Sequence, residues 1–307
     1  MKQNANTTFG TGWMHHQLIN ILRVVDVRLL YLFAAIFIVP VCLLLNTNRS
    51  RTTAYTFFHK RIGYSCLRAA WAVYINHFLF AQVVIDRFAM FAGQHFKVSV
   101  VGSEHFSRLA QQTKGFVQLS AHVGCYEIAG YTLVAKDKRI NALVFGGEKA
   151  TIMSGRTDQF SHNNIRMIPV LPDMSHLFAI NEALSHNEIV SMPADRKPNG
   201  GKTLTVEFLG QKAKIPMGPF SVPTMRSLDV LAVNVIKTSA KSYTAYVTTL
   251  EYDKQAPRKE QIKQLAEGYI RELERVVRQH PCQWFNFFDF WTTEEEERNK
   301  LKDKERS

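Results

Sequence analysis

The sequence lacks the paired cysteines that stabilise small secreted folds. Its four cysteines, Cys42, Cys66, Cys125 and Cys282, form no Cys-x-x-Cys motif, and Cys42 lies in a wholly apolar run. Disulfide frameworks and zinc sites both need cysteines or histidines at characteristic close spacings. We therefore expect reduced thiols, no disulfide framework and no bound metal. We also expect no cofactor.

Internal repeats and Gly- or Ser-rich linkers are also missing from the 307 residues. A chain of this length suits one large domain or two small ones, and we expect one catalytic domain after an N-terminal segment. Acidic residues are in the minority, with 26 Asp and Glu against 38 Lys and Arg, a net charge of +12. A basic surface attracts anionic bilayers, phosphorylated substrates or nucleic acid. No nucleic-acid recognition motif accompanies the charge, so we expect no nucleic-acid partner.

A membrane-anchoring segment is predicted within residues 1–53. Residues 29–45 contain no charge, and 17 residues is the short end of the range that spans a bilayer. Pro40 would break an ordinary helix, but membrane helices tolerate proline better. A cleaved signal peptide fits poorly, and a buried core helix is the alternative. Basic residues on both flanks, such as Arg28 and Arg49, give no orientation, so spanning and one-leaflet attachment both stay open.

The pattern of the remaining chain predicts an α/β fold. Residues 54–92 read as one helix that stops at Gly93. Short β-like runs then alternate with helix-like segments, which predicts a mostly parallel sheet flanked by helices. The expected strands are 97–102, 115–120, 140–145, 165–170, 188–194, 204–210, 229–236 and 243–250, and the expected helices are 104–113, 125–136, 147–160, 174–186, 218–227 and 257–279. We assign 54–291 to the catalytic domain and 292–307 to a charged tail.

One candidate catalytic pair lies in "LSAHVGCYEIAGY", residues 119–131. His122 ends a predicted strand, Gly124 permits a tight turn, and Glu127 falls in the next helix. Open α/β sheets place ligands at the carboxyl ends of their strands. A carboxylate bonded to one ring nitrogen makes the other nitrogen a better base toward a hydroxyl. The pair therefore predicts a general base, His122, oriented by Glu127, while a core histidine with an acid nearby is the alternative.

Two nucleophiles compete with this interpretation. Cys125 lies three residues from His122 on the far side of the turn, and most lone cysteines are structural. Ser120 precedes Ala and His, so the G-x-S-x-G elbow of α/β-hydrolases is absent. Both stay weaker alternatives.

A second cluster of candidate residues lies in 191–223. Asp195 and Arg196 follow a β-like run, and an arginine at a strand end can bind a phosphate bidentately. Gly218 opens a helix whose backbone N–H groups can face an anion, although a plain turn explains Gly218 equally well. The pattern predicts an anion-binding role for Arg196 and Gly218, with an ordinary surface loop as the alternative.

The order of these blocks resembles a known family. "LSAHVGCYEIAGY", "MPADRKPNGGKTLTVEFLGQKAKIPMGPF" (192–220) and "HPCQWFNFF" (280–288) follow an apolar N-terminal helix. This order is similar to that of the bacterial lipid A biosynthesis acyltransferases, the lauroyl/myristoyl branch of the lysophospholipid acyltransferase superfamily. The resemblance implies a glycerol-3-phosphate acyltransferase-like fold, His122 as base, Glu127 as its orienting acid, and a substrate-positioning role for Asp195 and Arg196.

The resemblance also implies the substrates and the location of the protein. The donor would be acyl-acyl carrier protein, or acyl-CoA, and the acceptor an anionic glycolipid such as a lipid A precursor. The protein would lie at the bacterial inner membrane with its catalytic domain on the cytoplasmic face. Cys125-Tyr126 replaces the family's usual Asn-Trp, which leaves ornithine lipids, other glycolipids or a pigment-linked acceptor as alternatives. A thioesterase or lipid hydrolase, or a non-catalytic lipid-binding protein, are the rival functions.

Overall fold

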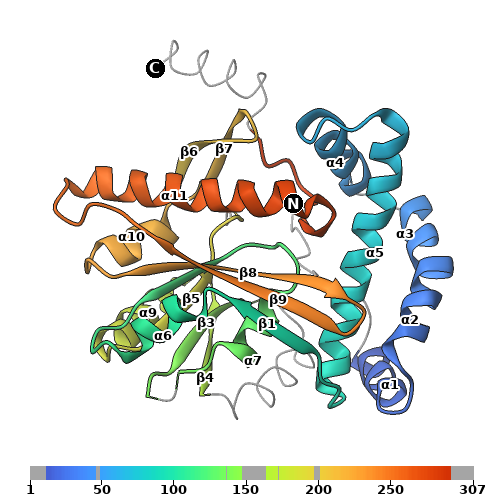
Figure 1. The fold of residues 1–307 in the computed structure, drawn as a ribbon, viewed down its shortest axis with the longest axis horizontal. Helices are drawn as coiled ribbons and strands as arrows, with labels where there is room; N and C mark the ends of the chain where they lie inside the picture. Colours follow the sequence, from blue (N-terminus) through green and yellow to red (C-terminus); the bar gives the residue numbers. More distant parts are fainter. Residues whose placement is uncertain are drawn as a thin grey trace.

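A seven-stranded sheet forms the centre of the computed structural model, which describes residues 12–45, 49–135, 137–146, 164–171, 173–196 and 201–291 (Figure 1). The strand order is β1-β9-β8-β2-β5-β3-β4, and every neighbouring pair is parallel except β8 and β9. The strands are β1 (Lys97–Val101), β2 (Val117–Ser120), β3 (Ile140–Phe145), β4 (Ile165–Val170), β5 (Ile189–Pro193), β8 (Val230–Ser239) and β9 (Ser242–Leu250). The predicted mostly parallel α/β sheet is confirmed.

Both faces of this sheet are buried, as its apolar strands require. Along β8, Val230 and Ala232 belong to one core cluster, whereas Leu231, Val233 and Val235 belong to the other. Successive side chains of a strand point to opposite faces, so one strand supplies both clusters. This explains why β8 reads as a continuous apolar run rather than as an alternating one.

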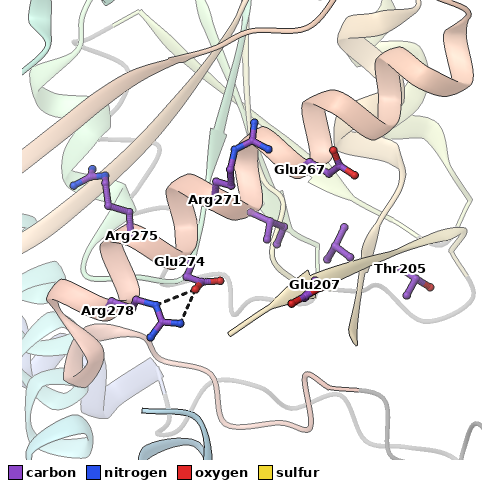
Figure 2. Close-up of a pocket in the computed structure, with 9 residues that line it drawn as sticks. Thr205, Glu207, Glu267, Arg271, Glu274, Arg275 and Arg278 are labelled. Carbon is purple, nitrogen blue, oxygen red and sulfur yellow. Dashed lines mark hydrogen bonds and ion pairs between the residues drawn. The ribbon is translucent and has the colours of Figure 1, made fainter. Parts of the chain in front are cut away.

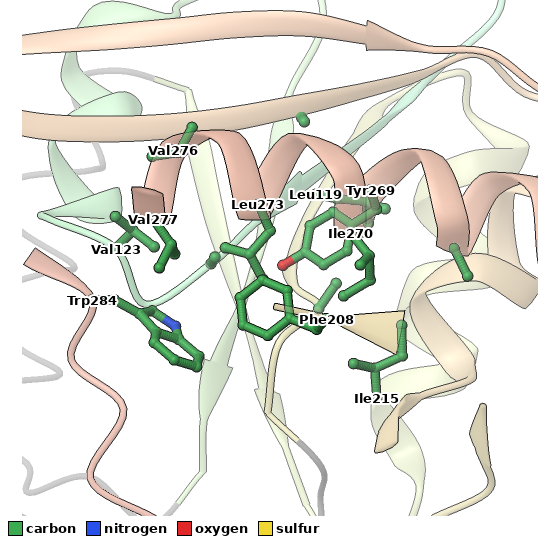
Figure 3. Close-up of a cluster of buried hydrophobic side chains, with 14 of the residues drawn as sticks. Leu119, Val123, Phe208, Ile215, Tyr269, Ile270, Leu273, Val276, Val277 and Trp284 are labelled. Carbon is green, nitrogen blue, oxygen red and sulfur yellow. The ribbon is translucent and has the colours of Figure 1, made fainter. Parts of the chain in front are cut away.

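Helices cover the two faces. On the face of Val230 lie α9 (Ser175–Ser185), α10 (Gly218–Thr224) and α11 (Arg258–Gln279), and α6 (Ser103–Gln111) and α7 (Ala129–Thr132) pack on the other. Figure 3 shows α11 lying along the sheet, with Ile270, Leu273 and Val277 directed into the cluster that contains Trp284. In place of the expected helix 125–136, the chain forms the 3₁₀ helix η3 (Tyr126–Ile128) and then α7, which ends at Thr132.

The strands β6 (Thr203–Phe208) and β7 (Gln211–Pro216) form a separate antiparallel hairpin. It packs in the same core cluster as Val230 and α11. Leu209 and Gly210 both have positive φ, as a tight two-residue hairpin turn requires. Sequence reasoning predicted a strand over 204–210 but missed β7. Its inward residues Ala213 and Ile215 alternate with exposed or half-exposed lysines, so a strand signal was present, although it extends over only four residues.

The predicted N-terminal helix is confirmed as one helical segment, Val27–Leu45, preceded by α1 (Gly12–Leu22). It consists of α2 (Val27–Phe33), the π-helical turn η1 (Ala34–Ile38) and α3 (Val39–Leu45). Pro40 follows the π turn, which is how a helix absorbs the missing N–H and the ring of a proline. Most of its apolar side chains are exposed: Leu29, Leu32, Phe33, Ile36, Phe37, Ile38, Val41, Leu44 and Leu45.

The helix predicted over 54–92 is interrupted. The chain forms α4 (Ser50–Thr56), the π turn η2 (Phe57–Arg61), a turn at Gly63 with φ +81°, and then α5 (Cys66–Phe91). The stop at Gly93 is confirmed, because this residue has φ +87°. Both Val27–Leu45 and α5 are long and apolar enough to cross a bilayer, and they favour membrane association. Figure 1 shows α2 and α3 lying along α5, on the side away from the sheet.

Two expectations lie outside the described residues, namely the helix over 147–160 and the charged tail 292–307.

A buried polar cluster joins the N-terminal helices to the sheet. Asp86 of α5 is fully buried, and its carboxylate lies 2.5 Å from the Nζ of Lys237 on β8. The hydroxyls of Tyr31, on α2, and Tyr243, on β9, also donate to Asp86. Lys237 donates further to the carbonyl of Ala240 at 3.1 Å. A buried charge of either sign needs such a partner, so this cluster fixes α2 and α5 against β8.

Replacement of Lys237 tests this attachment. Lys237→Met leaves the Asp86 carboxylate buried without its cation, and we expect the free energy of unfolding to fall by about 3–5 kcal/mol. Lys241→Met is the matched control, because Lys241, in the turn between β8 and β9, pairs with Asp26 at the start of α2, and both of these side chains are well exposed. Thermal unfolding in detergent would measure both variants. Equal, small losses in the two variants would contradict a structural role for the buried pair.

Candidate active site

The candidate site lies where β2 and β5 end side by side. The two strands pair in parallel with Ser120 opposite Pro193, and the N–H of Ala194 donates to the carbonyl of Ser120 at 2.9 Å. His122 follows β2 by two residues and Asp195 follows β5 by two residues. Matching offsets from paired strand ends bring these side chains together at the carboxyl edge of the sheet.

The carboxylate of Asp195 holds His122 through two contacts. Its Oδ1 lies 2.8 Å from the Nδ1 of the ring, and its Oδ2 accepts the backbone N–H of His122 at 2.9 Å. The side chain of Asp195 is 3% exposed, whereas that of His122 is 18% exposed. Because an ionised carboxylate only accepts hydrogen bonds, Nδ1 carries a proton in this arrangement. The Nε2 atom is then left as the basic nitrogen of the ring.

Burial alone would raise the pKa of Asp195, but the charge and hydrogen bonds of His122 and the nearby Arg196 outweigh it and hold the pKa below its usual value. Asp195 therefore stays ionised at neutral pH. An ionised partner stabilises the imidazolium that forms when Nε2 takes up a proton. The geometry and the charge state together suit a general base.

The structure does not bring together His122 and Glu127, the pair that the sequence predicted. Glu127 forms an ion pair with Arg87 of α5, with 2.6 Å between Oε1 and Nη2. The turn predicted at Gly124 is confirmed, with φ +60°, and it leads into η3, which directs Glu127 toward α5. His122 instead faces the end of β5. Among the described residues, no hydrogen bond joins His122 to Glu127.

Arg196 lies beside the pair, as the sequence predicted for a strand end. Its Nη2 donates to the carbonyl of Phe285 at 2.9 Å, and its guanidinium lies 6.0 Å from the centre of the Phe288 ring. The side chain is exposed, so its other N–H donors can reach an anion from solvent. Gly218 begins α10 but forms no hydrogen bond with His122, Asp195 or Arg196 in the described part of the chain.

The two rival nucleophiles are both poorly placed. Burial raises the pKa of Cys125 to about 12, so its thiol is neutral at physiological pH. The side chain packs in the apolar cluster with Val235 and Ile128. Ser120 is buried at the end of β2, and its carbonyl accepts the hydroxyl of Tyr269 at 2.9 Å. Neither side chain competes with His122 for a substrate at the surface.

A shallow depression of about 580 Å³ lies elsewhere, between α11 and the β6–β7 hairpin. Figure 2 shows its charged side chains, of which Glu274 and Arg278 form an ion pair. Three arginines and three glutamates line it, so their charges balance and it offers no net attraction for an anion. It contains none of the candidate catalytic residues.

Sequence reasoning found three of the site residues but missed how they connect. Asp195 was predicted to position substrate, and the structure shows that it holds the ring of His122. The sequence did contain a signal for this contact, because Asp195 and His122 each follow an apolar strand by two residues. Arg87 carried no recognisable signal, because it belongs to a long helix. Phe285 lies in the quoted block 280–288, but its contacts with His122 and Arg196 use backbone atoms, which the sequence does not reveal.

The chain is similar to known proteins over most of its length. The model of a family described as bacterial lipid A biosynthesis acyltransferase matches residues 81–293, more than half of the chain. A crystal structure of the 1-acyl-sn-glycerophosphate acyltransferase from Thermotoga maritima is similar at 14% identity, with a TM-score of 0.35, covering 89% of this chain and 99% of that chain. No curated protein matches the chain.

Thiol alkylation tests the exclusion of Cys125. At pH 8 a pKa of about 12 leaves roughly one Cys125 in 10⁴ as thiolate, so iodoacetamide should modify the exposed Cys66 well before Cys125. Peptide mass spectrometry would measure the two rates, and denatured protein provides the control in which both react. Alkylation of Cys125 as fast as Cys66 in the folded protein would reinstate it as a candidate nucleophile.

Proposed function

The chain belongs to the bacterial lipid A biosynthesis acyltransferase family, and from this membership we propose that it transfers a fatty acyl chain to a hydroxyl of a lipid A precursor or related anionic glycolipid. The family itself supports a lipid acyltransferase. The donor in our proposal is acyl-acyl carrier protein or acyl-CoA. The observation that carries the proposal is the His122–Asp195 pair at the carboxyl end of the sheet, with Arg196 beside it.

The proposed reaction needs one base and no covalent enzyme intermediate. The Nε2 atom of His122 takes the proton of the acceptor hydroxyl while the hydroxyl oxygen attacks the carbonyl carbon of the donor thioester. The new C–O bond forms and the C–S bond breaks. The imidazolium then returns its proton to the departing thiolate, so the products are an ester and a free thiol. Asp195 stabilises the imidazolium between the two transfers.

Arg196 is proposed to bind the anionic group of a substrate. One of its N–H donors is bonded to Phe285, which fixes the plane of the guanidinium, and the side chain reaches the solvent. A guanidinium in a fixed plane binds phosphate bidentately. The net charge of +12 supports the same class of partner, since it attracts both an anionic glycolipid and an acidic carrier protein. A binding role for Gly218 in the same site remains part of the proposal from the sequence.

We place the protein at the bacterial inner membrane, with the catalytic domain on the cytoplasmic face. The exposed apolar side chains of Val27–Leu45 support attachment to lipid. Helix α5, which packs against this segment, carries further exposed apolar residues, including Leu67 and Trp71. Arginines such as Arg23 and Arg51 flank the apolar segment, where anionic headgroups would meet them.

Substitutions in the catalytic pair test the mechanism. We expect His122→Ala and Asp195→Asn to lower the rate of acyl transfer roughly 10²- to 10⁴-fold, because one removes the base and the other its charged partner. Glu127→Gln is the matched control: it also neutralises a buried carboxylate, but one that pairs with Arg87. It should weaken the fold more than the transfer step. Purified protein, labelled acyl-acyl carrier protein and a lipid A precursor provide the measurement.

Other outcomes would point to other functions. Full activity of folded His122→Ala and Asp195→Asn would exclude the proposed base. Loss of transfer in folded Glu127→Gln, with full activity of Asp195→Asn, would restore Glu127 as the orienting acid. Release of free fatty acid at the full rate without any lipid acceptor would indicate a thioesterase, and vesicle binding without turnover of any donor would indicate a lipid-binding protein.

Vesicle binding tests the membrane attachment. Phe37→Asp places a charge on the apolar face of the N-terminal helix and should weaken binding to phosphatidylglycerol vesicles in a flotation assay. Phe145→Asp is the matched control, because Phe145 is an equally exposed phenylalanine at the end of β3. High salt should weaken binding of the unmodified protein, since part of the attraction is electrostatic. Equal binding of the two variants would argue against this surface.

A further inference from the structure

A short C-terminal segment, residues 282–285, lies against the loop that carries His122. The N–H of Phe285 donates to the carbonyl of His122 at 2.9 Å, and the N–H of Gly124 donates to the carbonyl of Gln283 at 2.8 Å. Val123 and Trp284 form the antiparallel bridge between these two bonds. We call residues 282–285 the strap, because they hold one edge of the catalytic loop.

The opposite side of the same loop rests on β8. The N–H of Cys125 donates to the carbonyl of Val235 at 2.9 Å, and Gly124 approaches that carbonyl so closely that a Cβ atom would lie 1.9 Å from it. The loop therefore lies between the strap and β8. Its position depends on how these two segments are held relative to one another.

The strap also holds the proposed anion-binding residue. The carbonyl of Phe285 accepts the Nη2 of Arg196, while the N–H of the same residue holds the carbonyl of His122. A single residue of the strap thus connects the loops after β2 and β5. A shift of Phe285 would change the separation between the base and the guanidinium.

Two buried amides anchor the strap. The side chain of Gln283 forms a pair of hydrogen bonds with the backbone of Lys237 on β8: its Oε1 accepts from the Lys237 N–H at 2.9 Å, and its Nε2 donates to the Lys237 carbonyl at 2.8 Å. The Nδ2 of Asn76, on α5, donates to the carbonyls of Cys282 and Trp284 at 2.9 and 3.0 Å. Both side chains are less than 9% exposed.

We propose that Gln283 is a positioning residue for acyl transfer, with Asn76 as the second anchor of the strap. This inference rests on the proposed function. Gln283 joins β8 through its side chain and the catalytic loop through its backbone, so one residue sets the distance between them. Gln283 does not reach the ring of His122 and acts through the backbone of the loop.

The expected effect follows from geometry. The base must meet the acceptor hydroxyl at hydrogen-bonding distance, and a displacement of about 1 Å lowers a rate about 100-fold. In Gln283→Glu, a carboxylate oxygen replaces the Nε2 donor and faces the carbonyl of Lys237. We expect a kcat about 10- to 100-fold lower with KM essentially unchanged. As the pH falls, protonation of the new carboxyl restores a donor, so the ratio of variant to unmodified rates should rise.

Gln261→Glu is the matched control. Gln261 is also a buried glutamine whose Nε2 donates to two backbone carbonyls, those of Lys254 and Ala256. It lies near the start of α11, and the strap follows the other end of that helix, about 30 Å away along its axis. A comparable loss of thermal stability with an unchanged kcat is expected for this variant.

The decisive experiment combines acyl-transfer kinetics with amide hydrogen exchange of residues 122–125 and 283–285 in both variants. Faster exchange in these segments and a lower kcat in Gln283→Glu alone would support the proposal. Unchanged kcat and exchange in folded Gln283→Glu, or equal losses in both variants, would overturn it. If Gln283→Glu does not fold, Asn76→Ser removes the two amide donors without a buried charge and should give the same losses; unchanged kcat there would overturn the proposal.

Amide hydrogen exchange distinguishes a failure of this inference from a failure of the proposed function. If the unmodified protein transfers no acyl group to any lipid, the proposed function fails. The exchange of residues 122–125 in Gln283→Glu then still decides whether the strap holds the loop of His122.

Discussion

The parallel pairing of β2 with β5 is the constraint on which the candidate site depends. His122 and Asp195 are 73 residues apart in the chain, yet each lies two residues beyond the end of its strand. The register that sets Ser120 opposite Pro193 therefore sets the carboxylate beside the imidazole. A shift of one residue would turn side chains to the other face of the sheet and separate the pair. The buried strands specify that register through the two core clusters they supply.

Helix α5 contacts several of the segments that support this site. Three of its side chains contact three different parts of the molecule: Asn76 holds the strap, Asp86 binds Lys237, and Arg87 binds Glu127. In each ion pair a buried carboxylate meets a cation, which the low dielectric of the interior requires. Because α5 also packs against α2 and α3, the apolar N-terminal segment and the catalytic loop share one support.

The carboxylate that binds His122 is not the one nearest to it in the sequence. Glu127 is near His122 along the chain, but its ion pair with Arg87 fixes η3 against α5. Asp195 is distant along the chain and holds both the ring and the backbone of His122. The two acids therefore have separate roles: Glu127 binds Arg87 and fixes η3, and Asp195 binds the imidazole of His122. Arg196 follows Asp195 directly, so a single strand end directs a negative charge to His122 and a positive charge toward the solvent.

Most of the local structure and the family could be predicted from the sequence alone. Apolar periodicity predicted seven sheet strands and one strand of the hairpin, the long helices, and the apolar segment Val27–Leu45, because these patterns depend on neighbouring residues alone. It also identified His122, Asp195 and Arg196 as strand-end residues. Only the tertiary structure decided that Asp195, not Glu127, holds His122, since strand order and the direction of η3 are not local properties. The strap was likewise beyond the sequence: its contacts with His122 and Arg196 use backbone N–H and carbonyl groups, which every residue carries.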